Sequence, residues 1–174
     1  MKRLKNEIKE VLNGKKDITD SDLVKMQYLK CVIKETLRLH PPIPLLVPRI
    51  ARADTKIMGY DIGIGTWVMI NAWTIGREVG YWDEPEEFKP ERFLDSKVDF
   101  IGHDFQLIPF GAGRRGCPGI SFAIATNEIV LANLVHRFDW KLPNGVEGED
   151  LDMTERPSVT IARKFPLLTL AKPC

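Results

Sequence analysis

Residues 110–120 have the sequence FGAGRRGCPGI, and this stretch is the most informative part of the chain. Its four glycines allow the backbone to turn tightly and to approach a flat group closely, because no side chain intervenes. Cys117 lies at the start of a predicted helix, where free N–H groups and the positive end of the helix dipole stabilise a thiolate. Arg114 and Arg115 add positive charge nearby. The pattern indicates a metal-ligating sulfur, and the alternative for an isolated cysteine is an inert, buried thiol.

The composition excludes several classes of protein. The chain has 174 residues, 44% of them hydrophobic, and could bury one sizeable core. Its 25 basic residues nearly balance 24 acidic ones, so charge gives no reason to expect nucleic acid or an anionic membrane as the main partner. Cysteines at 31, 117 and 174 are odd in number and lack C-x-x-C spacing. This argues against a disulfide framework or structural zinc and fits a reducing, cytosol-facing setting.

No stretch is predicted to be a signal peptide or a membrane helix. The first 16 residues are charged and helix-patterned, without an apolar core. Residues 120–135 are the most apolar helical stretch, but they include Ser121, Asn127 and Glu128, which are too polar for a membrane span. We therefore expect residues 120–135 to form a buried core helix.

The periodicity and the turn residues predict the following order of elements. A helix over 3–12 ends near Asn13-Gly14, and a longer helix capped by residues 19–22 continues to about residue 39. Four prolines between 41 and 48 end that helix and favour an extended run over 43–49. The remaining predictions are a strand pair of 55–58 with 66–71 around a turn at 59–61, an ordered loop over 82–93, a helix over 118–137 with Pro118 in its first turn, and loops with short terminal strands over 142–171.

The helix over 24–39 carries charge on an apolar face. Glu35 and Arg38 project on the same stripe as apolar residues, and Ile33 and Leu37 make the opposite side apolar too. A helix covered on both sides tolerates an acid and a base only when they are paired. The alternative is an ordinary surface ion pair at i,i+3 spacing.

Three motifs resemble those of the cytochrome P450 superfamily. Residues 110–119 match its F-x-x-G-x-R-x-C-x-G loop at all five fixed positions. KETLRLHPP at 34–42 is similar to its E-x-x-R helix, and PERF at 90–93 is similar to its P-E-R-F loop. The phrases at 27–30, 56–60 and 165–167 resemble the plant seventy-one clan in particular. The resemblance runs over nearly all of the chain.

This resemblance implies a fold that is mainly α with small β-sheets (α+β). Residues 1–174 would form the C-terminal part of a single cytochrome P450 domain, with the E-x-x-R helix, the P-E-R-F loop, the cysteine loop and the following helix. The N-terminal two-thirds, with a membrane anchor and the distal helix, would be absent. The family also implies that Glu35, Arg38 and Arg92 form a buried structural network beneath the cysteine loop.

The resemblance implies haem b as the cofactor, with Cys117 as the axial ligand of the iron and no other catalytic residue in this chain. Arg115 and Arg49 would bind the haem propionates. Phe110 would pack against the ring near the sulfur, and Ala123 would permit close approach of the helix. The loop positions Gly111, Gly113 and Gly119 complete the implied cofactor site.

The implied activity is that of a haem-thiolate monooxygenase, which inserts one oxygen atom of O2 into a small apolar substrate, in plant secondary metabolism. NADPH would act indirectly, through an NADPH-cytochrome reductase docking near Arg114, and an anchor would hold the full-length parent on the cytosolic face of the endoplasmic reticulum membrane. Terpenoids, phenylpropanoids and furanocoumarin-type molecules all remain open as substrates. The alternative is a truncated, non-catalytic haem-binding or interaction fragment. The residues expected to face the substrate are Ile43, Leu45, Leu46, Val47, Ser158 and Val159.

Overall fold

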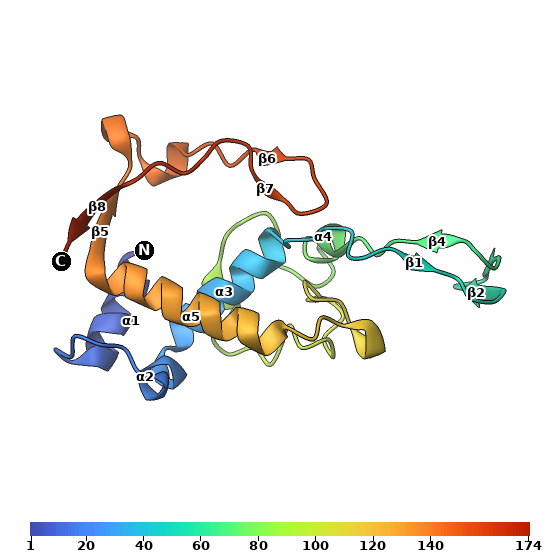
Figure 1. The fold of residues 1–174 in the computed structure, drawn as a ribbon, viewed down its shortest axis with the longest axis horizontal. Helices are drawn as coiled ribbons and strands as arrows, with labels where there is room; N and C mark the ends of the chain where they lie inside the picture. The colour runs from blue at the N-terminus through green and yellow to red at the C-terminus, as the bar shows by residue number, and fades with distance from the viewer.

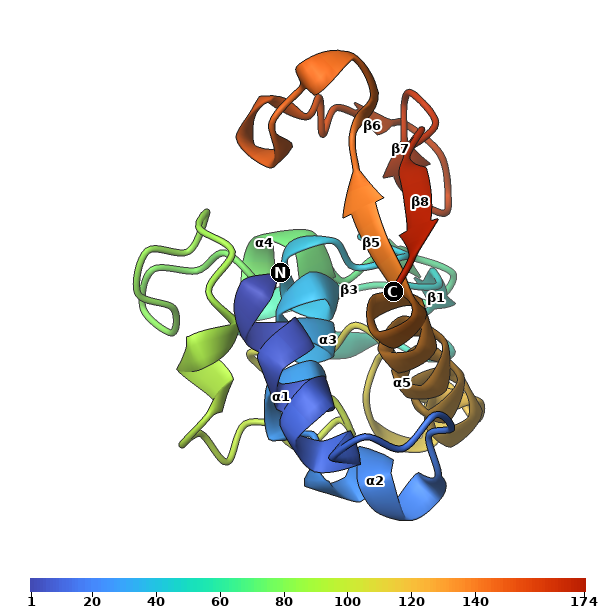
Figure 2. The same cartoon turned by 90° about the vertical axis from the view of Figure 1, so that its left-hand side faces the viewer.

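The computed structural model describes residues 1–174, and three of its helices pack side by side around the main core (Figure 2). These are α1 (Lys2–Leu12), α3 (Gln27–Leu39) and α5 (Ile120–Arg137). The side chains that they contribute to this core recur every three or four positions, so each helix turns one apolar face toward it. Four small antiparallel sheets of two strands each complete the chain, which confirms the expected α+β class. The core side chains from these helices are Leu4, Ile8, Leu12, Leu29, Ile33, Leu37, Ala132 and Val135.

The predicted helix from residue 19 to 39 is in fact two helices, so that prediction was wrong. α2 (Asp20–Lys25) and α3 are separated at Met26, whose φ of −82° and ψ of 81° are not helical. The carboxylate of Glu7, on α1, accepts the N–H groups of Tyr28 at 2.6 Å and Leu29 at 2.9 Å. Those donors are free at the start of any helix, and here a neighbouring helix satisfies them. The break therefore depends on a contact between residues far apart in sequence.

The strands beside α3 pair differently from the prediction. β2 (Thr55–Ile57) pairs with β3 (Tyr60–Ile62), whereas β1 (Arg49–Ile50) pairs with β4 (Trp67–Val68). The turn is tighter than expected and lies at Met58-Gly59, where φ is 50° and 87°. These two pairs form an arm that extends away from the helices (Figure 1).

Two loop predictions also needed correction. The run over 43–49 is not extended throughout, because Leu46 has a φ of 50° and its N–H donates to the carbonyl of Ile43 at 3.0 Å. Leu46 is buried against Ile108 and against Ala72 of α4 (Ala72–Ile75), and this burial stabilises the turn. The loop over 82–93 ends in the 3-10 helix η1 (Pro90–Phe93) rather than remaining irregular.

α5 is less buried than the sequence indicated. Only Ala132 and Val135 are buried, and Phe122 is 79% exposed. Its apolar residues point in several directions, while the rest of this chain covers one side only. The helix begins at Ile120, so Pro118 precedes it rather than lying in its first turn. No helix of the structure combines the length and the apolar character needed to cross a membrane.

The chain after α5 forms short strands and turns, as predicted. β5 (Phe138–Lys141) pairs with β8 (Leu170–Pro173), and β6 (Glu155–Arg156) pairs with β7 (Ala162–Arg163). Two single 3-10 turns, η3 (Pro143–Gly145) and η4 (Gly148–Asp150), lie between β5 and β6. The hairpin of β6 and β7 returns toward the end of α3 (Figure 1).

The cap of α2 predicts a dependence of stability on pH. Asp22 is buried, and its carboxylate accepts the Thr19 hydroxyl at 2.7 Å, the Lys15 ammonium at 3.0 Å and the Thr19 N–H at 3.1 Å. These bonds, the Thr19 hydroxyl above all, lower the pKa of Asp22 from 3.8 to about 2. The stabilisation is therefore complete above pH 3.8 and is lost as the pH falls toward 2. We expect Asp22→Asn to lower the Tm at pH 7, and the difference from wild type to narrow toward pH 2.

Thermal unfolding followed by circular dichroism at pH 7, 4 and 2 measures this. Asp20→Asn is the matched control, because Asp20 lies on the same turn and is exposed. If Asp22→Asn lowered the Tm by the same amount at pH 2 and at pH 7, the charge of the carboxylate would not be what stabilises the cap.

Candidate functional site

The cysteine loop is closed by backbone hydrogen bonds. The Cys117 N–H donates to the carbonyl of Phe110 at 2.9 Å, and the Gly116 N–H donates to the carbonyl of Gly113 at 2.9 Å, across the 3-10 helix η2 (Gly113–Arg115). Gly111 and Gly113 have φ values of 73° and 66°, in the left-handed region that favours glycine. A side chain at Gly113 would extend into open space, so its requirement is conformational rather than steric. The loop places Cys117 three positions before Ile120, the first residue of α5.

The sulfur of Cys117 is exposed and has one hydrogen-bond donor from the chain. The Gly119 N–H, which caps α5, lies 3.4 Å from Cys117 Sγ. All three cysteines are free, but burial raises the pKa of the Cys31 thiol, which stays protonated. Cys174 is exposed and directly follows β8, and the Lys5 ammonium on α1 donates to its sulfur at 3.2 Å. Cys117 is thus the exposed cysteine that lies on the glycine loop just before α5.

Four arginines surround a hollow beside the cysteine loop. Arg49 on β1 donates from Nη2 to the carbonyl of Arg115 at 3.1 Å, and this bond joins the β arm to the loop. The hollow has a volume of about 740 Å³ and contains no acidic side chain. Such a site favours an anionic group. The sequence indicated Arg49 and Arg115, but not the position of Arg52, because only the course of β1 brings it there. The lining residues are Pro48, Arg49, Ile50, Arg52, Arg114 and Arg115.

Phe110 precedes Cys117 in the sequence, and Ala123 follows it on α5. Phe110 is half-buried, meets the ring of Phe100 edge-on at 5.9 Å and packs against the helical core. Ala123 is half-buried in the first turn of α5, and its N–H donates to the carbonyl of Gly119 at 2.9 Å. The roles inferred for both toward a bound group stay predictions.

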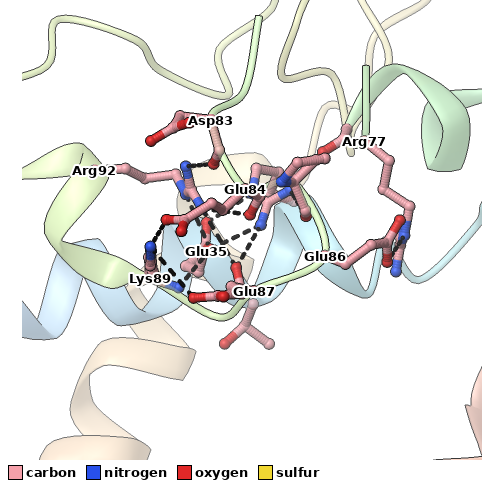
Figure 3. Close-up of polar contacts among 12 residues, drawn as sticks. Glu35, Arg77, Asp83, Glu84, Glu86, Glu87, Lys89 and Arg92 are labelled. Atoms are coloured by element: carbon pink, nitrogen blue, oxygen red, sulfur yellow. Dashed lines mark hydrogen bonds and ion pairs between the residues drawn. The ribbon is translucent and has the colours of Figure 1, made fainter. Parts of the chain in front are cut away.

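A buried ion network joins α3 to η1 and to the loop before it. Glu35 and Arg38 are almost completely buried and form two bonds, Nε to Oε2 at 2.7 Å and Nη2 to Oε1 at 2.8 Å. Arg92 of η1 donates to the same Oε1 at 3.1 Å, and the Lys89 N–H does so at 2.7 Å (Figure 3). The structure thus confirms that Glu35 and Arg38 are paired on a helix that is buried on both sides, and Arg92 binds the same carboxylate.

The guanidinium groups of this network also hold a loop through its backbone carbonyls. Arg38 donates to the carbonyls of Gly76 at 2.6 Å and Pro85 at 2.7 Å. Arg92 donates to the carbonyl of Asp83 at 2.7 Å (Figure 3). Both arginines also donate to the carbonyl of Glu87. Sequence reasoning missed these acceptors because every residue has a carbonyl. The glycine at position 76 is the one sequence feature that marks this contact. A Cβ there would lie 2.6 Å from the backbone carbonyl oxygen of Arg38, so only glycine allows the loop to approach α3 this closely.

Trp82 completes the network. It is buried, and its ring lies 5.3 Å from the Arg38 guanidinium carbon and 6.0 Å from that of Arg92. Aromatic rings attract guanidinium groups at such distances. The tryptophan therefore shields both cations from water and packs against Phe93 of η1, with ring centroids 5.7 Å apart.

The residues expected to face a substrate lie in two segments that the structure connects. Ile43 is half-buried, Leu45 and Val47 are exposed, and Leu46 packs into a small core cluster. Ser158 and Val159 are exposed in the turn between β6 and β7. The two segments meet where the Ile161 N–H donates to the carbonyl of Pro42 at 2.9 Å. Their role toward a substrate stays a prediction.

Comparison with known proteins identifies the family. The profile of the cytochrome P450 family matches residues 1–169. Cytochrome P450 71A8 of Mentha piperita is 61% identical over 98% of this chain, and psoralen synthase of Ammi majus is 56% identical over 99%. A zebrafish cytochrome P450 solved with abiraterone superposes with a TM-score of 0.86 at 29% identity, over 99% of this chain and 39% of that one. The chain belongs to the cytochrome P450 family.

Within that family, the chain is similar to plant proteins of the seventy-one type. It covers 34% of the Mentha piperita protein and 35% of the Ammi majus protein. The chain thus spans about a third of the length of the curated relatives it matches.

The buried network predicts a large and specific loss of stability. Glu35→Gln leaves two guanidinium groups without their carboxylate, and breaking a buried ion pair in this way costs about 3–5 kcal/mol. Glu91→Gln is the matched control on the neighbouring helix, because the Glu91 side chain is 48% exposed and pairs with Arg3 at the surface. Its expected cost is below about 1 kcal/mol. Urea unfolding of the wild type and both variants measures the two changes in the free energy of unfolding. Similar changes for Glu35→Gln and Glu91→Gln would contradict the prediction that the buried network depends on Glu35.

Proposed function

We propose that this chain is the C-terminal part of a cytochrome P450 monooxygenase, in which Cys117 is the axial ligand of the haem iron. The observation that carries the proposal is the exposed Cys117 sulfur at the start of α5, on a glycine loop that lies beside four arginines. Membership of the cytochrome P450 family supports it independently.

The residues present fit a haem. A single soft sulfur ligand suits iron, and the left-handed glycines keep the loop free of side chains where a flat ring would approach. The haem propionates are carboxylates, and Arg49 and Arg115 line the hollow in which such groups would be neutralised. Phe110 and Ala123 would then contact the ring from the loop and from α5.

Haem with a thiolate ligand supplies the activation of dioxygen, with one oxygen atom going into the substrate. The roles of this chain are to hold and to orient. Cys117 would present its sulfur to the iron, with the Gly119 N–H directed at that sulfur, and the arginines would balance the propionates. The Glu35 network keeps the loop rigid, so the ligand has one position.

The proposed substrate is a small apolar molecule of plant secondary metabolism. Leu45, Val47 and Val159 expose apolar side chains on the two segments expected to line the site. Psoralen synthase of Ammi majus and premnaspirodiene oxygenase of Hyoscyamus muticus, which is 54% identical over 96% of this chain, are relatives whose names fit such chemistry. The substrate itself stays open among terpenoids, phenylpropanoids and furanocoumarin-type molecules.

The proposed full-length protein takes its electrons from an NADPH-dependent reductase, which would dock near Arg114. It would lie on the cytosolic face of the endoplasmic reticulum, held by an anchor outside residues 1–174. We further propose that residues 1–174 do not sustain catalysis by themselves. The side chains of Phe122, Val130 and Leu134 are exposed along α5, and large apolar surfaces of this kind are normally covered.

Replacement of the cysteine ligand tests the proposal. In the full-length protein, Cys117→Ser is expected to abolish the ferrous–CO absorption band of thiolate-ligated haem and the monooxygenase activity, because a hydroxyl is a poor substitute for the thiolate. Cys174→Ser, at the other exposed cysteine, is the matched control and is expected to retain both. Identical spectra for the wild type and Cys117→Ser would refute thiolate ligation at this position.

The arginine hollow gives a second test. Arg49→Ala removes both a guanidinium of the hollow and its bond to the Arg115 carbonyl, so we expect haem to dissociate about 10-fold faster. Arg156→Ala, at an exposed arginine on β6, is the control. Transfer of haem to apomyoglobin measures the rate. An unchanged rate for Arg49→Ala would exclude the hollow as the propionate site.

A further inference from the structure

The hairpin of β6 and β7 is attached to the end of α3 by a side-chain pair. His40 caps α3, and its Nδ1 lies 3.0 Å from Oε1 of Glu155 on β6, 115 positions away in sequence. A carboxylate only accepts hydrogen bonds, so the imidazole N–H is the donor. Neither residue belongs to the haem loop or to the Glu35 network.

A second contact attaches the other side of the same hairpin. The Ile161 N–H, directly before β7, donates to the carbonyl of Pro42 at 2.9 Å. Most other hairpin side chains are exposed, including Ser158 and Val159 at the turn. The hairpin residues therefore contribute little apolar burial that could fix the turn, and these two hydrogen bonds attach the hairpin to the end of α3.

His40 is held in place by the helix that it caps, α3. The His40 N–H donates to the carbonyl of Thr36 at 2.8 Å, which continues the backbone ladder of α3. α3 is buried along both sides, and Arg38, two positions before His40, is fixed by Glu35. The position of the hairpin is thereby tied to the same helix that supports the cysteine loop.

We propose that His40 and Glu155 form a latch that positions the Ser158–Val159 turn relative to residues 43–47, and that they act as specificity-determining positioning residues. This inference rests on the proposed function, because it takes those two segments as the walls of the substrate site. The latch sets the width of the apolar space between them without contacting the substrate. Loss of the latch should change how tightly bulky ligands are held and leave the iron ligation intact.

The experiment uses the full-length haem protein and two azoles as probes. Imidazole contacts little beyond the iron, whereas 4-phenylimidazole also requires an ordered apolar wall. We expect His40→Ala and Glu155→Ala to raise the Kd of 4-phenylimidazole relative to that of imidazole by about 10-fold, since a hydrogen bond to a charged group is lost. His40→Asn keeps an N–H donor toward Glu155. In this variant the ratio of the Kd of 4-phenylimidazole to the Kd of imidazole should stay within about 2-fold of the wild-type ratio. His103→Ala, at an exposed histidine, is the matched control.

Hydrogen exchange of residues 155–163 provides a readout that does not depend on haem. We expect about 10-fold faster exchange in His40→Ala and Glu155→Ala, no further increase in the double variant, and recovery in His40→Asn. Equal weakening of both azoles, or faster exchange with an unchanged ratio of Kd values, would overturn the specificity role. Unchanged exchange would overturn the latch itself. If wild type showed no spectral response to imidazole, the proposed function would fail, while the exchange data would still decide whether the latch exists.

Discussion

The structure depends on one buried carboxylate. Glu35 is removed from water and accepts hydrogen bonds from two guanidinium groups and one backbone N–H. Burial of a charge is tolerated only when its partners are complete, and this requirement fixes α3 and η1 against each other. Because the arginines then bind the carbonyls of residues 76–87, a segment without regular structure acquires a single conformation.

The same interaction reaches the cysteine loop through packing. Phe93 of η1 and Trp82 form a small cluster with Cys31 and Leu107, and Leu107 lies three residues before Phe110. Phe110 in turn packs on the helical core beside Phe100. The loop that presents Cys117 therefore lies on a packed base, which is what the proposed role as a metal ligand requires. An exposed thiol on a mobile loop would not have that property.

Sequence patterns predicted the parts of the site that depend on residue type. The glycines of the cysteine loop, the position of Cys117 at a helix start and the pairing of Glu35 with Arg38 follow from local chemistry, and each is present in the structure. Patterns failed where a distant contact decides. Glu7 caps α3 and breaks the predicted long helix, and the burial of Leu46 replaces a predicted extended run with a turn.

The sequence by itself determined the family and singled out Cys117 as the candidate ligand, because motif spacing and the conformational demands of glycine and proline are local properties. The pattern on α3 also indicated that Glu35 and Arg38 had to be paired, and the resemblance to the family added Arg92 of η1 to that pair. Only the tertiary structure decided which carbonyls Arg38 and Arg92 bind, that Arg49 and Arg52 lie beside Arg115, and that His40 meets Glu155. Every residue has the same backbone carbonyl, and the type of a residue such as arginine or histidine does not indicate which distant residue it will contact. Such contacts are therefore set by how the elements pack.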